Sequence, residues 1–122
     1  MPKAPEATDQ SPLSDVDNLD VIVELKAGGV DMLIVTIAPF DESDSTCERL
    51  EQKLNAYLYA ALHENFSKNY PAADDGHVRI FVDDAHPIST RARILVETFA
   101  RQALARGVVV LIGGFVANPA TH

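Results

Sequence analysis

Apolar and polar side chains alternate along residues 19–26, which is the two-residue period of a β-strand. A second apolar stretch, residues 31–37, follows the paired glycines Gly28 and Gly29. Because glycine readily adopts the positive φ angles of a tight turn, the two stretches are predicted to form an antiparallel hairpin.

Two later stretches carry apolar residues at intervals of three and four, the spacing of an amphipathic helix. The first runs from Ser45 to about Lys68, where Ser45 and Glu48 have capping-box spacing and a Tyr-Pro dipeptide stops the helix. The second begins near residue 88 and ends before Gly107, a residue type that often follows the last turn of a helix.

Two further apolar segments predict strands. Residues 77–82 alternate, with the valines and the isoleucine on the core face. Residues 108–116 form a continuous apolar run that is interrupted by Gly113 and Gly114, which predicts a bulge there. Because a strand of this kind is apolar on both faces, we expect it to be central in the sheet or covered by a partner.

The predicted element order is β-β-α-β-α-β. It describes an α/β fold, more closely an α+β two-layer sandwich, with a mixed four-stranded sheet and two helices on one face. The single-face prediction rests on polar residues assigned to the outer faces of the first and third strands: Glu24, Lys26, His77 and Arg79. The side chains that these periods turn inward form the predicted core: Leu54, Leu58, Ile80, Val82, Leu95, Phe99, Val109 and Leu111.

The chain divides into a tail and one domain. Residues 1–18 contain proline, serine and acidic residues without periodicity, which predicts a flexible N-terminal tail. Residues 19–117 are predicted to form a single globular domain, and residues 118–122 a loose C-terminus. With 122 residues, the chain is long enough to build one hydrophobic core.

The formal net charge of −8 disfavours nucleic acid and membrane surfaces as partners, because both carry negative charge. Cys47 is the only cysteine, so a single chain forms neither a disulfide nor a thiolate metal cluster. The sequence shows no signal-peptide pattern and no apolar run of membrane-spanning length, so the expected location is the cytoplasm. No pattern of residues predicts a cofactor.

Asp83, Asp84 and His86 are the first candidate site, because they follow the third predicted strand, where open α/β sheets often bind ligands. Two carboxylates and an imidazole have the chemistry to hold a divalent metal or to share a proton. The alternative is a polar loop whose side chains cap the next helix ahead of Pro87. The composition of the loop favours the cap.

Asn55, Tyr57 and Tyr70 are the second candidate site, in which Asn55 and Tyr70 would form hydrogen bonds to each other or to the end of the segment near Pro71. In the structural alternative, Tyr57 is a core aromatic and Asn55 bonds to a backbone group. The alternative is favoured, because buried polar groups usually serve structure.

The segments 53–58 (Lys-Leu-Asn-Ala-Tyr-Leu) and 70–73 (Tyr-Pro-Ala-Ala) resemble an uncharacterised bacterial family of small single-domain proteins, a domain of unknown function. The likeness covers roughly residues 17–116. It implies this fold and a cytoplasmic location, and it implies no catalytic residue. The family carries a histidine and an aromatic residue among the acids after the second strand, where this chain has Ala-Pro-Phe-Asp-Glu at 38–42.

Two functions are consistent with these patterns. The first is a non-catalytic interaction module that binds a protein partner, or a second copy of itself through the last strand. The second is a small enzyme or divalent-metal-dependent binder that uses Asp83, Asp84 and His86. The first is favoured, because the chain has no catalytic motif and because its last strand is apolar on both faces.

Overall fold

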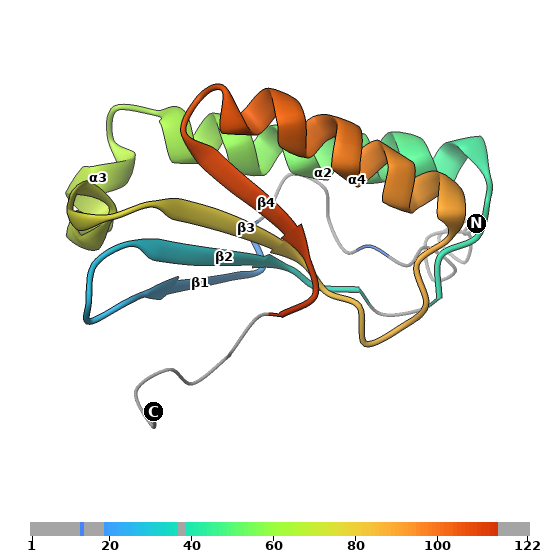
Figure 1. The fold of residues 1–122 in the computed structure, drawn as a ribbon, viewed down its shortest axis with the longest axis horizontal. Coiled ribbons are helices and arrows are strands. Elements are labelled where there is room, and N and C mark those ends of the chain that lie inside the picture. The colour runs from blue at the N-terminus through green and yellow to red at the C-terminus, as the bar shows by residue number, and fades with distance from the viewer. Residues whose placement is uncertain (1–12, 14–18, 37–38, 115–122) are drawn as a thin grey trace, which may run out of the picture.

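The computed structural model describes residue 13 and residues 19–36 and 39–114 (Figure 1). In this part of the chain the elements follow the predicted order, with a short helix and a 3₁₀ turn added after the first long helix. They are β1 (Val21–Glu24), β2 (Val30–Ile34), α2 (Asp44–Leu62), α3 (Phe66–Asn69), η1 (Pro71–Asp75), β3 (Val78–Val82), α4 (Thr90–Leu104) and β4 (Val108–Ile112).

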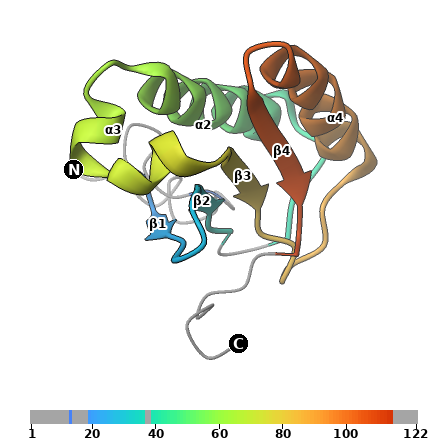
Figure 2. The ribbon, with the colours of Figure 1, turned by 60° about the vertical axis from the view of Figure 1, so that its left-hand side comes forward.

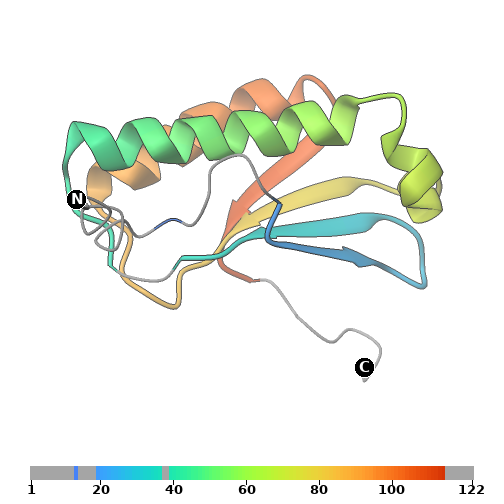
Figure 3. The ribbon, with the colours of Figure 1, turned by 180° about the vertical axis from the view of Figure 1, so that it is seen from behind.

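The four strands form one mixed sheet in the order β1-β2-β3-β4, in which β1 is antiparallel to β2 and the other neighbours are parallel. The long helices α2 and α4 both lie on one face of this sheet (Figures 1 and 3). The predicted two-layer fold is therefore confirmed. Gly28 and Gly29 have φ angles of 103° and 98° and form the hairpin turn between β1 and β2, as expected.

The register shows which side chains face the helices. Ile22, Met32, Ile80 and Val110 lie opposite one another across the four strands, and all belong to the core or pack against it. The prediction that Glu24 lies on the outer face is therefore wrong. Glu24 pairs with the core residue Val30, which places it on the helix side, where its carboxylate accepts a bond from the N–H of Ala72. Val21 and Val23 lie on the opposite face.

Most of the predicted core residues are buried: Leu54, Leu58, Ile80, Val82 and Phe99. The prediction is wrong for three others, since Leu95 and Val109 are half-buried and Leu111 is 40% exposed. Of the two alternatives for the last strand, central in the sheet or covered by a partner, the central position is also wrong. β4 is an edge strand, because α4 connects β3 to the position directly beside it, and Val109 and Leu111 point away from the helices.

The ends of the predicted segments shift in several places. β4 ends at Ile112, and Gly113 and Gly114 follow it with φ angles of 71° and 82°, so they end the strand instead of forming a bulge within it. Residues 115–116 of the predicted strand lie outside the described residues.

Leu13, assigned to the tail, is 2% exposed and forms an isolated antiparallel bridge with Thr36. The remainder of segment 1–18 and residues 118–122 lie outside the described residues.

The cap of α2 differs from the predicted one. Ser43, not Ser45, caps the helix, because its Oγ accepts a hydrogen bond of 3.1 Å from the N–H of Thr46. Asp41 Oδ1 in turn accepts bonds from the Ser43 hydroxyl at 2.6 Å and from the Ser43 N–H at 3.0 Å. These bonds hold the pKa of the Asp41 carboxyl below its ordinary value, and the bond from the Ser43 hydroxyl has the largest effect. The helix ends at Leu62, earlier than expected.

Leu54→Ala tests the placement of the core. Leu54 is fully buried, so its truncation should lower the free energy of unfolding by about 2–5 kcal/mol, as large-to-small core changes do. Leu62→Ala, on the same helix but 38% exposed, is the matched control and should cost about 1 kcal/mol or less. Urea unfolding of both variants measures the difference, and equal losses would contradict the assigned face of α2.

Candidate functional site

The loop after β3 uses the Asp83 carboxylate for its own structure. Asp83 Oδ1 accepts a bond of 3.0 Å from the N–H of Ala85, and Oδ2 accepts one of 3.3 Å from the Thr36 hydroxyl. The Asp83 N–H donates to the carbonyl of Ile34 at 3.0 Å. The loop is therefore closed by an aspartate turn, a common structural use of this residue type.

The other two candidates of this loop do not join Asp83 in a cluster of ligands. Asp84 is exposed and lies against Gly113, where an added Cβ would collide with its carboxylate, and His86 is half-buried. In the described part of the chain, no three His, Cys, Asp or Glu side chains converge as a metal ion requires. The expectation that loop side chains cap α4 is wrong, because Ser89 Oγ does so by accepting from the N–H of Ala92 at 3.1 Å.

The structure separates the second predicted cluster. Asn55 is exposed on α2, whereas Tyr57 is fully buried on the core side of the same helix. Tyr70 follows α3, and its ring lies 5.0 Å from that of Phe66. Of the predicted alternatives, the core role of Tyr57 is confirmed, and Asn55 takes no part in it.

Tyr57 instead belongs to a buried polar junction with Asp20 and Lys53, which joins α2 to the first two strands. The Tyr57 hydroxyl donates to the carbonyl of Leu33 at 2.7 Å and accepts from the N–H of Asp20 at 2.6 Å. Lys53 is fully buried, and its Nζ lies 3.0 Å from Asp20 Oδ1. Asp20 Oδ2 accepts from the N–H of Val35 at 2.9 Å.

The sequence contained a signal for the buried lysine. Leu50, Lys53, Leu54 and Tyr57 follow the three-and-four spacing of the inward face of α2, and all four are buried. A lysine on that face needs an anionic partner, because an unpaired buried charge is very costly. Asp20 is that partner, but no local pattern links it to a helix more than 30 positions later.

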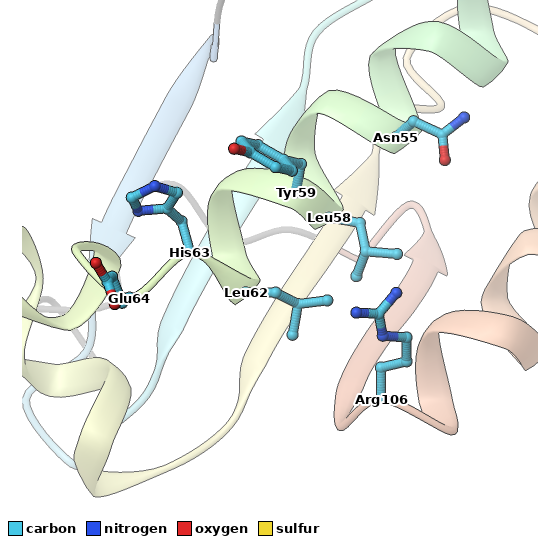
Figure 4. Close-up of a pocket in the computed structure, with 7 residues that line it drawn as sticks. All are labelled: Asn55, Leu58, Tyr59, Leu62, His63, Glu64 and Arg106. Carbon is cyan, nitrogen blue, oxygen red and sulfur yellow. The ribbon is translucent and has the colours of Figure 1, made fainter.

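A surface hollow of about 660 Å³ lies near the ends of α2 and α4 (Figure 4). Leu58 and Leu62 form its apolar part, and the Arg106 side chain extends toward them in Figure 4. Tyr59 and His63 lie on one side with ring centroids 5.8 Å apart. Tyr59 is 72% exposed, and His63 Nδ1 accepts a bond of 3.1 Å from the N–H of Asn65. The hollow is thus a shallow surface feature with an apolar floor.

The face of the sheet opposite the helices carries an apolar row. The register sets Val21, Leu33, Phe81 and Leu111 side by side across all four strands. No described helix lies over this face (Figures 2 and 3). The row ends at the exposed side chain of Leu111, on the outermost strand.

An ion pair between a partly exposed arginine and a buried aspartate occupies the neighbouring row. Arg79 Nε and Nη2 donate to the two carboxylate oxygens of Asp31 at 2.8 Å each, and Asp31 is only 4% exposed. The Arg79 guanidinium also lies 5.1 Å from the ring centroid of Phe81, within the range of a cation–π contact. Because the two charges neutralise each other, this face is locally neutral although the protein is acidic.

The two edges of the sheet differ in character. β1 has four residues, ends in Glu24, and is flanked by Asp20 and Lys26. β4 consists of five consecutive apolar residues without a charge or a proline. Natural edge strands are usually protected against pairing by charged side chains, prolines or bulges. Judged by the residues that the structure describes, β4 is an unprotected edge and β1 is a protected one.

No family model, curated protein or solved structure matches the chain. The resemblance of segments 53–58 and 70–73 to an uncharacterised family therefore stays a prediction. Within the described residues, none of the helices combines the length and the apolar character that a membrane crossing requires.

Tyr57→Phe tests the polar junction, because it removes the hydroxyl that bonds both Leu33 and Asp20. We expect a loss of about 1–3 kcal/mol in the free energy of unfolding. The matched control Tyr59→Phe alters an exposed ring and should cost less than about 0.5 kcal/mol. Urea unfolding of the two variants gives the comparison.

The same variants test the titration of Tyr57. Burial raises the pKa of the Tyr57 phenol above its ordinary value, so the folded state keeps a proton that the unfolded state loses. This contribution is complete below the unfolded pKa of about 10 and is lost as the pH rises toward the folded pKa. Tyr57→Phe should therefore reduce the fall in stability between about pH 9 and pH 11, and an unchanged fall would contradict the assignment.

Proposed function

We propose that this protein is a non-catalytic interaction module that binds another chain by strand addition at β4. The observation that supports the proposal is the apolar edge of β4, on which none of the five residues is charged and the side chain of Leu111 is exposed. A partner strand would pair with the backbone groups of that edge and extend the sheet.

The rest of the protein is consistent with a binding role. In the described residues, the Asp83 carboxylate serves the turn after β3, and the buried groups Lys53, Asp20 and Tyr57 bond one another and the backbone. The net charge of −8 favours a protein partner over nucleic acid. We place the protein in the cytoplasm, where a lone cysteine remains reduced.

Leu111→Lys tests the proposal, because a lysine on an edge strand opposes the addition of another strand. The wild-type protein should form a complex heavier than its 13.2 kDa chain, either when purified or when cross-linked in its source cell. The variant should weaken that complex about tenfold or more, since a charge in the interface loses hydration. Sedimentation velocity measures the first case, and the yield of cross-linked product measures the second.

Ile94→Lys is the matched control. It introduces the same charge at an apolar residue that is 58% exposed on α4, outside the β4 edge, so it should leave the complex intact. Thermal melts of both variants establish that each is folded. A complex that persists in the Leu111→Lys variant would overturn the proposal. A wild-type chain that stays at 13.2 kDa, both when purified and when cross-linked in its source cell, would also overturn it.

A further inference from the structure

The backbone groups on the free edge of β4 follow from its bond to β3. The N–H of Gly113 donates to the carbonyl of Val82 at 2.7 Å, so the backbone of Gly113 points toward β3. Because these directions alternate along a strand, the backbones of Val109 and Leu111 also point toward β3. Those of Val108, Val110 and Ile112 point toward the free edge.

We propose that the strand added at this edge is β4 of a second copy, antiparallel to the first and related to it by a two-fold axis at Val110. This inference rests on the proposed function and names its partner. Val110 then pairs with its own counterpart, and Val108 pairs with Ile112. Each of these pairs exchanges two hydrogen bonds, so every outward-pointing group of the strand is satisfied.

Other registers are poorer. A shift of one residue sets outward-pointing groups opposite groups that point toward β3, so the ladder of hydrogen bonds cannot form. A shift of two residues centres the pairing on Val109 or Leu111 and loses a hydrogen-bonded pair at one end. The register at Val110 uses the whole length of the strand and keeps the helices of both copies on one side of a continuous sheet.

The flank of α4 next to this edge is also suited to a second copy. Arg91, Leu95 and Thr98 line a groove against α2, so the opposite flank of α4 faces away from α2. The residues at helical spacing on that flank are Arg93, Glu97, Ala100 and Leu104, of which Leu104 is 63% exposed.

A two-fold axis would bring this flank toward its own counterpart in the other copy. Arg93 and Glu97 place opposite charges within one stripe, so neither copy presents a surface of a single charge to the other. Ala100 leaves room for a close approach, and Leu104 supplies apolar area. A partner with a uniformly acidic or basic flank would fit this mixture less well.

Disulfide trapping tests the partner and the register together. In a Cys47→Ala background, Val109→Cys and Leu111→Cys are prepared as two separate proteins. Val109 of one copy lies opposite Leu111 of the other in a pair without hydrogen bonds, where Cα atoms are about 4.5 Å apart. That separation is within the range of a disulfide.

The expected result is a cross-linked dimer when the two proteins are mixed and oxidised, and about tenfold less cross-linking in either protein alone. Cross-linking of Val109→Cys alone or Leu111→Cys alone would overturn the register at Val110. A purified wild-type protein that stays at 13.2 kDa in native mass spectrometry and a mixture without cross-links would overturn the second copy as partner.

The two proposals fail in different ways. If the purified chain is monomeric but a heavier complex in the source cell is lost in Leu111→Lys, strand addition stands and the second copy is the wrong partner. If neither setting contains a complex, both proposals are wrong.

Discussion

The buried junction of Lys53, Asp20 and Tyr57 fixes the first long helix on the sheet. A charged amine without solvent contact needs an anion, and Asp20 supplies it from the residue directly before β1. The carboxylate also binds the N–H of Val35, and the Tyr57 hydroxyl bridges the backbones of Asp20 and Leu33. The Asp20 carboxylate and the Tyr57 hydroxyl therefore satisfy backbone groups at both strands of the hairpin, and Lys53 ties that carboxylate to α2.

Among the described residues, no such junction lies at the opposite end of the sheet. β4 is held by β3 and by the apolar face of α4, and the free edge of its five residues carries no charged side chain. A sheet can close an edge with polar groups, cover it, or pair it with another chain. In this protein, polar and charged residues protect the edge at β1, and we infer that another chain pairs with the edge at β4.

Periodicity predicted the element order, the paired glycines predicted the hairpin turn, and the order of the elements predicted the mixed sheet. It failed where the outcome depends on which segments meet. The alternation in β1 shows two faces, but only pairing with Met32 establishes that Ile22 is the one that faces the helices. The apolar run of β4 predicted burial on both faces. The structure places β4 at the edge of the sheet, and the residues of a strand do not by themselves specify which strands lie beside it.

The candidate sites show the same limit. The sequence pattern places Asp83 at the end of a strand, as the structure does, but the bonds of Asp83 to Ala85 and Thr36 depend on the path of the loop and of β2. Lys53 lay within the apolar stripe of α2, yet its partner Asp20 is brought to it only by the fold. A local pattern can therefore identify which residues are unusual, and the tertiary structure decides what they bind.

Pairing of the β4 edge with a second copy changes which backbone amides are bonded, and amide hydrogen exchange reports this residue by residue. In a dilution series of the wild-type protein, protection of the Val108, Val110 and Ile112 amides should rise with protein concentration, because these groups form bonds only in the dimer. The amides of β1 should show no such dependence. Exchange at Val108, Val110 and Ile112 that is the same at every concentration up to about millimolar, at which even very weak pairs associate, would contradict pairing of β4 with a second copy.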